Sequence, residues 1–289
     1  MAGLPGVQRL PQKMPLISVP GIGDEFVPVI YVGTPGSQQK AIVTLVDGFS
    51  CLPRAVLKIA LGDGAVSSIF REAQVLKYLA EKGVGAVPEL LWHDEKAECT
   101  CQSLVVGRLS GRKLRANHVD WLLRLPRTNK GITPEEFRSD LAVTSTWTDE
   151  FSPAEFLRLQ RLIDTFQFDT PIPAVLVHGD FAPWNLKRQH NGEIAAFDWE
   201  DARIKGLPLH DLSHFFLIQG CLFGIKYPYE AMRGNLLVRN YLSAFGLDLA
   251  LLKPLFLHYL VTRISGQAGD CSDLYRSYLM RQLKLLVAQ

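Results

Sequence analysis

The sequence has little of what marks a secreted, disulfide-stabilised protein. It contains five cysteines, an odd and scattered set made up of Cys51, Cys99, Cys101, Cys221 and Cys271. This set argues against a disulfide framework and favours a reducing, cytoplasmic compartment. Cys99 and Cys101 could bind a metal together with His93, but no second cluster of cysteine and histidine has ligand spacing, so we expect no metal there.

Strong charge and long apolar runs are missing as well. The formal net charge is only +2, so no basic footprint for nucleic acid is visible. The most apolar stretches, residues 211–225 and 249–264, are short or interrupted by charged residues and proline, so we expect buried helices and not membrane spans. Residues 1–25 lack the apolar core of a secretory signal, and we expect a surface lead-in there.

What is present is the composition of a globular protein with a sizeable core. The chain of 289 residues is 47% hydrophobic and 21% charged, which is enough for one large domain or two lobes. Up to residue 106 it is rich in β-branched and aromatic runs separated by turn residues. We expect strands at 26–33, 40–47, 54–60, 88–94 and 99–109, and one helix at 64–83.

From residue 107 onward the pattern becomes mostly helical. We expect helices at about 117–125, 134–146, 153–167, 210–225, 229–245, 248–264 and 272–287. The change falls in the segment Gly107–Gly111, which predicts an N-terminal lobe of residues 1–106 and a C-terminal lobe of residues 107–289. The fold class is therefore α+β, with a β-rich half followed by a helical half.

One segment interrupts the helical half with a pair of short strands. An apolar run ends in His178-Gly179-Asp180, Asn185 follows five residues after Asp180, and a second apolar run ends in Asp198. Asp and Asn are ordinary turn residues after a strand, so the first triplet alone identifies nothing. The whole combination is more restrictive, because it supplies a carboxylate that can accept a proton and two oxygen donors suited to Mg²⁺.

This combination resembles the aminoglycoside phosphotransferase and choline kinase superfamily, whose members share the bilobal protein-kinase-like fold. The family pattern is H-G-D-x-x-x-x-N followed by an Asp at the end of the next strand. The resemblance implies that Asp180 is the catalytic base and that Asn185 and Asp198 are catalytic residues that hold the metal. His178 is then expected to orient the loop by hydrogen bonding.

The resemblance extends over about residues 26–220. It implies that Lys58 binds the nucleotide phosphates and that Glu72, on the following helix, pairs with Lys58. Segment 103–114, which includes Val106, resembles the hinge whose backbone reads the base, and Asp211 is expected to hold the catalytic loop by hydrogen bonds.

The loop between the first two strands departs from the pattern of a glycine-rich phosphate loop. It reads "VGTPGSQQ" and lacks G-x-G-x-x-G. Backbone amides from Gly36 to Gln38 could still cover phosphates, because small residues allow a close approach of the backbone. We therefore assign Gly36 and Ser37 to nucleotide binding, with an ordinary hairpin loop as the alternative.

The implied activity is transfer of the γ-phosphate of ATP, or alternatively GTP, with Mg²⁺, to a hydroxyl of a small molecule. The expected acceptor is a sugar, a polyol or an amino alcohol, lying near residues 181–184 and 199–201. Trp184 and Trp199 could bind such a ligand, although packing in the core is expected for at least one of them. We expect no nucleic-acid or membrane partner, and the oligomeric state stays open.

Two other functions remain as alternatives. A catalytically weak, kinase-like protein could bind nucleotide and act through a partner, although the presence of Lys58, Asp180, Asn185 and Asp198 argues against this. Phosphorylation of proteins is less favoured, because the segment between Asp198 and Asp211 is too short for a long activation loop.

Overall fold

The structure, a computed structural model, describes residues 17–19, 23–96, 98–142, 144, 147, 149–166, 168, 170–266 and 273–288. The lead-in expected over residues 1–25 lies outside the described residues, apart from 17–19 and 23–25, and so does Cys271. The chain divides into two compact units. The first contains the chain up to Leu76 together with Pro88–Leu104, and the second contains Lys77–Val87 and the chain from Val105 onward.

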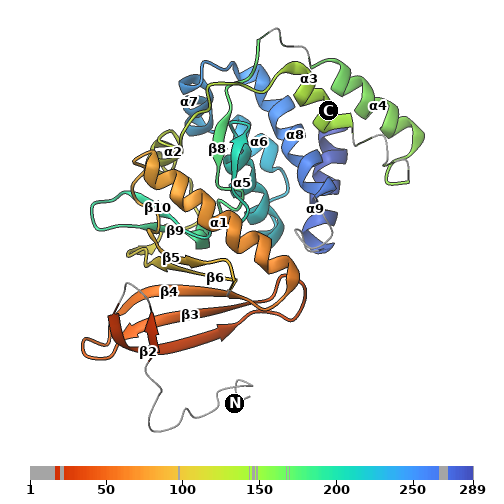
Figure 1. Ribbon diagram of the computed structural model, residues 1–289. Coiled ribbons are helices and arrows are strands. Elements are labelled where there is room, and N and C mark those ends of the chain that lie inside the picture. The colour runs from red at the N-terminus through yellow and green to blue at the C-terminus, as the bar shows by residue number, and fades with distance from the viewer. Residues whose placement is uncertain are drawn as a thin grey trace. The chain divides into compact units, whose positions relative to one another are not determined.

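The first unit is built on a six-stranded antiparallel sheet in the order β1-β2-β3-β4-β6-β5 (Figure 1). The strands are β1 (Ile17–Val19), β2 (Gly23–Val32), β3 (Lys40–Asp47), β4 (Pro53–Ala60), β5 (Leu90–Asp94) and β6 (Cys99–Ser103). Strand β3 alternates between buried and half-buried residues, as expected for a sheet with one face on the core. That core consists of Phe26, Val43, Leu45, Ala55 and Cys101.

Helix α1 (Asp63–Glu81) follows β4. The apolar stripe expected for it is confirmed, since Ile69, Ala73, Leu76 and Leu79 are all buried. These positions recur every three or four residues and so share one face of the helix. The helix ends two residues before Gly83, where the sequence predicts a C-terminal stop.

The second unit is mainly helical, with two small sheets in the orders β10-β9-β7 and β11-β8. The helices are α2 (Ala116–Leu122), α3 (Pro134–Ala142), α4 (Pro153–Asp164), α5 (His210–Phe223), α6 (Pro228–Arg233), α7 (Leu236–Ala244), α8 (Leu252–Ser265) and α9 (Asp273–Val287). The strands are β7 (Arg108–Leu109), β8 (Val175–Val177), β9 (Leu186–Arg188), β10 (Ile194–Ala196) and β11 (Arg203–Gly206). Short 3₁₀ turns cover Pro183–Asn185 and Leu249–Leu251.

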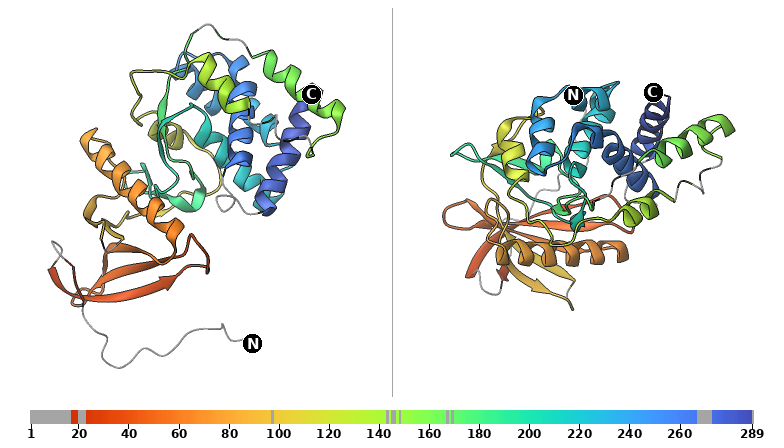
Figure 2. Two further views of the ribbon diagram at one scale, coloured as in Figure 1. Left: turned by 45° about the vertical axis from the view of Figure 1, so that its right-hand side comes forward. Right: turned by 90° about the horizontal axis from the view of Figure 1, so that it is seen from above.

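Helix α8 forms the centre of the helical unit and contacts α3, α5 and α9. Both views in Figure 2 show α9 beside it. Ten of the fourteen residues of α8 are buried, which explains why its sequence is apolar on nearly every side. Among the described helices none is long and apolar enough alone to cross a membrane, and only the pair Leu236–Ala244 and Leu249–Ser265 passes that test together, across a bend of 105°.

The expected α+β fold class, a β-rich half followed by a helical half, is confirmed, but two expected elements are wrong in detail. The helix expected at 229–245 is two helices, α6 and α7, because the side chain of Asn235 accepts a hydrogen bond from the Leu237 amide at 2.9 Å and begins a new helix. The strand expected at 99–109 is interrupted after Ser103 and resumes as the short strand β7 at Arg108.

Candidate active site

The segment His178–Asp180 leaves strand β8 through a turn that only glycine fits. Gly179 has a φ of +85°, and a Cβ at this position would clash with the backbone oxygen of Asp201. Strand β8 is buried along its whole length and pairs with β11, where Val177 lies opposite Arg203. The sequence therefore directs Asp180 out of a rigid, buried strand into a sharply turned loop.

Asp211 holds this turn from helix α5. Its two carboxylate oxygens accept hydrogen bonds from the backbone amides of His178 and Gly179, each at 2.9 Å. Burial raises the pKa of Asp211, whereas the two amides and the neighbouring histidines act against that shift. The loop-holding role expected for Asp211 is confirmed.

The imidazole of His178 links the two motif segments. Its Nδ1 accepts a hydrogen bond from the Asp180 amide at 3.3 Å, and its Nε2 lies 3.0 Å from the backbone oxygen of Phe197. The side chain is fully buried, so it has no access to a substrate. These contacts agree with the orienting role expected for His178.

Asp180 is held from two sides. The side-chain amide of Asn185 donates to Oδ2 of Asp180 at 2.8 Å and to its backbone oxygen at 3.1 Å. On the other side, Nε2 of His214 lies 2.7 Å from Oδ1 of Asp180. Burial acts to raise the pKa of Asp180, but contact with His214 and the nearby side chains of His178 and Arg263 hold it at about 2. The carboxylate is therefore ionised at neutral pH.

His214 is not among the residues expected from the sequence, although its spacing along α5 gives a signal. His214 lies three residues after Asp211, so both side chains lie on the same face of α5. Because Asp211 is bonded to the backbone of the loop, a polar residue one turn further along α5 is in reach of the side chain of Asp180. Helix periodicity applied to "HDLSHFF" would have pointed to it.

Asn185 and Asp198 lie at the same end of the β9–β10 hairpin. Leu186 is the register partner of Ala196, and the Phe197 amide donates to the backbone oxygen of Asn185 at 3.1 Å. Asp198 follows directly and has a φ of +72°. A left-handed conformation is uncommon for residues other than glycine, although Asp adopts it more readily than most, and strained residues tend to cluster at active sites.

These two residues fit a magnesium ion by their donor chemistry. The amide nitrogen of Asn185 is bonded to Asp180, which leaves its amide oxygen for another role. An amide oxygen and a carboxylate are the hard donors that Mg²⁺ prefers, and the ion usually completes its shell with phosphate and water. Among the described residues, no group of three or more His, Cys, Asp and Glu could hold a metal.

In the first unit, Lys58 and Glu72 form the expected pair. Nζ of Lys58 lies 2.9 Å from Oε1 and 2.8 Å from Oε2 of Glu72. Both residues are buried, with 6% and 1% of their surface exposed. A buried charge is costly unless it is paired, so the contact between β4 and α1 stabilises both groups.

The expected phosphate loop is fastened to the beginning of the same helix. The backbone oxygen of Ser37 accepts a hydrogen bond from the Ala65 amide at 3.0 Å, and that of Gln39 accepts from the amides of Leu61 and Gly62. Gly36 has open space around it and a φ of +151°. The loop thus caps the first turn of the helix that carries Glu72, which the sequence did not predict.

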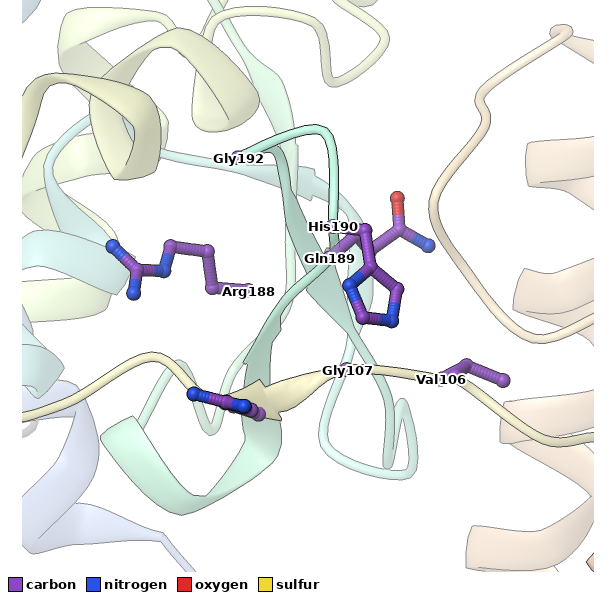
Figure 3. A pocket seen from close by; sticks show the side chains of 7 residues that line it. Val106, Gly107, Arg188, Gln189, His190 and Gly192 are labelled. Carbon is purple, nitrogen blue, oxygen red and sulfur yellow. The ribbon is translucent and has the colours of Figure 1, made fainter.

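Val106, expected to lie at the nucleotide base, is exposed and lines a pocket of about 590 Å³ in the second unit (Figure 3). The other lining residues are Gly107, Arg108, Arg188, Gln189, His190 and Gly192. Figure 3 shows the side chains of Arg188 and His190 directed to opposite sides of the chain segment that carries both residues. Beside the pocket, Nζ of Lys187 donates to the backbone oxygen of Val105 at 2.7 Å.

The aromatic residues near the motif divide into core and surface. Trp199 and Phe181 are fully buried, and both pack around Trp121 with ring centroids 5.8 and 5.7 Å away. The expectation that at least one tryptophan belongs to the core is confirmed, and an acceptor lying against Phe181 or Trp199 is excluded by their burial. Trp184 keeps 39% of its surface exposed.

The motif residues described above all lie within the part of the chain that matches a known protein family. The family model described as "Phosphotransferase enzyme family" matches residues 36–224, which is more than half of the chain. The chain belongs to the phosphotransferase enzyme family. This membership confirms the expected class of enzyme, a small-molecule phosphotransferase. No curated protein matches its sequence.

Solved structures of other phosphotransferases share the fold of this family member at low sequence identity. The GDP and kanamycin complex of APH(2")-IIia has a TM-score of 0.58 at 15% identity, covering 90% of this chain and 93% of that one. Macrolide 2'-phosphotransferase type I has a TM-score of 0.55 at 18% identity, covering 88% and 90%. Choline kinase LicA from Streptococcus pneumoniae has a TM-score of 0.50 at 16% identity, covering 91% and 94%.

Proposed function

We propose that this phosphotransferase moves the γ-phosphate of ATP, or of GTP, to a hydroxyl group of a small molecule. The observation that carries the proposal is the geometry around Asp180. Its carboxylate is ionised, is fixed by Asn185 and His214, and is presented on a turn held by Asp211. A carboxylate held in this way suits the orientation of an attacking hydroxyl group.

In the proposed reaction the acceptor oxygen forms a bond to the γ-phosphorus. The bond between that phosphorus and the β,γ-bridging oxygen breaks, and its electron pair leaves with the nucleoside diphosphate. The hydroxyl proton passes to Asp180, which releases it to solvent after the transfer. Because the pKa of Asp180 is about 2, its main work is to orient the hydroxyl, and the proton moves late, as in a loose transition state.

The remaining site residues receive roles from their chemistry. Lys58, fixed by Glu72, would neutralise phosphate charge, and backbone amides at Gly36 and Ser37 would cover the phosphates. The Val106 backbone would contact the base. Asn185 and Asp198 would hold Mg²⁺, which when bound supplies positive charge to the transferred phosphate.

This assignment divides the chain into a nucleotide-binding lobe, residues 1–106, and a catalytic, substrate-binding lobe, residues 107–289. We place the enzyme in the cytoplasm, where nucleotide is supplied and where the described cysteines Cys51, Cys99, Cys101 and Cys221 remain free thiols, as they are here. We expect neither nucleic acid nor membrane as a partner.

For the acceptor we propose a sugar, a polyol or an amino alcohol. Structurally similar proteins bear names that refer to kanamycin, macrolides, choline and ethanolamine, which are all hydroxylated small molecules. Near the motif, the exposed face of Trp184 suits stacking on a sugar ring or a quaternary ammonium group. Glu200, two residues after Asp198, is half-buried and could accept a hydrogen bond from the acceptor molecule.

The test is transfer of radiolabelled γ-phosphate over a panel of sugars, polyols and amino alcohols, with ATP and GTP compared and Mg²⁺ omitted as control. Asp180→Asn serves as the inactive variant, and its nucleotide affinity is measured in parallel. Labelled product that requires Mg²⁺ and Asp180 supports the proposal. Tight nucleotide binding without transfer to any acceptor would favour the alternative, a kinase-like protein that acts through a partner.

A further inference from the structure

A chain of buried polar side chains begins behind Asp180 and runs into the helical core. Nε2 of His214 lies 2.7 Å from Oδ1 of Asp180, and its Nδ1 lies 2.7 Å from the hydroxyl of Tyr259. The Tyr259 hydroxyl lies 3.0 Å from that of Tyr275. His214, Tyr259 and Tyr275 are all buried and come from three different helices, α5, α8 and α9.

The contacts in this chain fix the His214 ring from both of its nitrogens. Nε2 faces a carboxylate oxygen of Asp180, which can only accept a hydrogen bond while it is ionised. Nδ1 faces the Tyr259 hydroxyl, which can pair with it in either direction, and the Tyr275 hydroxyl holds that of Tyr259 in turn. The orientation of the His214 ring is therefore set by residues of two other helices.

Packing leaves His214 few other orientations. The ring is edge-on to Tyr259 and to Tyr275, with centroids 6.2 and 6.1 Å away. The side chain is 1% exposed, so it does not touch solvent or substrate. Its neighbour in the loop, Asp180, keeps 30% of its side chain exposed. Of these two side chains, only the carboxylate of Asp180 is exposed enough to contact the hydroxyl group of a phosphate-accepting molecule.

We propose that His214 is a positioning residue for phosphate transfer: it fixes the carboxylate of Asp180 from behind, in an orientation set by Tyr259 and Tyr275. The expected effect on turnover rests on the proposed function, whereas the contact between His214 and Asp180 does not. Asn185 holds one oxygen of Asp180 and His214 the other, so the plane of the carboxylate is defined at both ends. Loss of His214 releases one end.

The chain offers a matched control. His258, a buried histidine on α8, has its Nε2 2.9 Å from a carboxylate oxygen of Asp140. This second pair has the same chemistry, lies in the same unit, and does not touch Asp180. Changes that break the two pairs in the same way should therefore have similar structural consequences and different functional ones.

The first measurement does not depend on turnover. Protein labelled with ¹⁵N-histidine is observed by NMR, and the signal of His214 is assigned by its loss in His214→Gln. We expect a protected Nε2–H proton that shifts in Asp180→Asn and stays in place in Asp140→Asn, which should instead shift the signal of His258. A His214 ring without a protected Nε2–H, or one that does not respond to Asp180→Asn, overturns the proposal.

The second measurement uses kcat and the nucleotide KM for an acceptor found in the panel. His214→Leu should lower kcat by about 100-fold with little change in nucleotide KM, the size of loss that a small misplacement of a reacting group produces. His214→Gln, whose amide can replace the Nε2 donor, should recover most of that loss, and His258→Gln should stay close to the unmodified enzyme.

The two measurements separate two kinds of failure. If the unmodified protein transfers phosphate and His214→Leu, folded by its thermal transition, has the same kcat as His258→Gln, the positioning role is wrong. If the unmodified protein transfers to no acceptor, the proposed function fails, and the NMR response of His214 to Asp180→Asn still decides whether the contact exists.

Discussion

Each compact unit contains a contact between a carboxylate and a basic side chain, and the two contacts differ in exposure. Lys58 and Glu72 are both buried, and the ammonium meets both oxygens of the carboxylate. In the second contact His214 is buried, whereas Asp180 is partly exposed and shares its oxygens between an imidazole and an amide. The first contact buries both charged groups, and the second leaves the carboxylate of Asp180 partly exposed.

This difference predicts where each contact acts. A pair with both groups buried contributes to the stability of its unit in addition to the phosphate contact proposed for Lys58, because removing one partner leaves the other charge buried without it. A carboxylate that is fixed on one side and open on the other contributes mainly to chemistry. Four experiments, from the largest expected effect to the smallest, can break or sharpen this distinction.

The largest effect is expected for Asp180→Asn. Removal of the negative charge should lower the rate of phosphate transfer by about 10²- to 10⁴-fold, because the attacking hydroxyl loses both the group that orients it and its late proton acceptor. The affinity for nucleotide should change little, since the amide is nearly the same size as the carboxylate. Steady-state kinetics and nucleotide titration measure the two quantities. A variant with an unchanged rate would contradict the role proposed for Asp180.

The second effect is on stability, in Lys58→Met. The change leaves Glu72 buried beside an apolar side chain and should destabilise the first unit by about 3–5 kcal/mol. The double variant Lys58→Met/Glu72→Gln should recover part of that loss, because no charge then remains buried. Denaturant unfolding followed by circular dichroism measures both. Equal stability of the single and double variants would show that Glu72 does not carry a costly buried charge once Lys58 is replaced.

The third effect concerns pH. The pKa of Asp180 is lowered from 3.8 to about 2 in the folded protein, so its contribution to stability is complete above the ordinary pKa and disappears as the pH falls through the folded pKa. The difference is worth about 2 kcal/mol between roughly pH 4 and pH 2. The pKa of Asp211 is raised, so its contribution to stability changes with pH in the opposite sense. Asp211 is present both in the unmodified protein and in Asp180→Asn, so its contribution cancels when the two are compared.

This contribution is measured by comparing the unfolding free energy of the unmodified protein and Asp180→Asn across that pH range. The difference in unfolding free energy between the unmodified protein and Asp180→Asn should narrow or reverse toward acid, because the variant has no carboxylate at position 180 to protonate. Parallel curves would mean that Asp180 has an ordinary pKa and that His214 does not stabilise its charge.

The smallest effect is expected for Tyr259→Phe. It removes one buried hydroxyl and leaves Nδ1 of His214 without this hydrogen-bond partner, which should cost about 1 kcal/mol of stability or somewhat more. The kcat should fall less than in His214→Leu, because the Nε2 contact with Asp180 remains. Thermal unfolding and kinetics together test this, and a loss of kcat as large as that of His214→Leu would place Tyr259 closer to the chemistry than the contacts indicate.

The two contacts also show what a sequence can reveal. Lys58 and Glu72 were predictable because a strand lysine and a helix glutamate stand at a spacing that belongs to a known pattern. His214 was not predicted, because the family pattern includes Asp211 alone and the contact with Asp180, 34 positions earlier, exists only when α5 docks on the loop. The helical period of α5, which places His214 one turn after Asp211, is the only signal of it in the sequence.

Other limits of the sequence have local physical causes. The break between α6 and α7 depends on a side-chain cap at Asn235, which competes with a hydrophobic period that is otherwise continuous. The burial of Trp199 depends on packing with Trp121, nearly eighty residues away, and no periodicity within either segment predicts it. The strand and helix order of the first unit was predictable because its turns carry Gly, Pro and Ser between clear apolar runs.

The hydrogen bond from the Ala65 amide to the backbone oxygen of Ser37 couples two parts of the first unit mechanically. The loop between β2 and β3 and the first turn of α1 are joined, and Glu72 lies two turns further along the same rigid rod. Any force that draws the loop toward a ligand is therefore also a force on the Lys58–Glu72 pair. By reciprocity, a ligand on the loop should slow amide hydrogen exchange at Ala65, and loosening of the pair should weaken the loop's hold on that ligand.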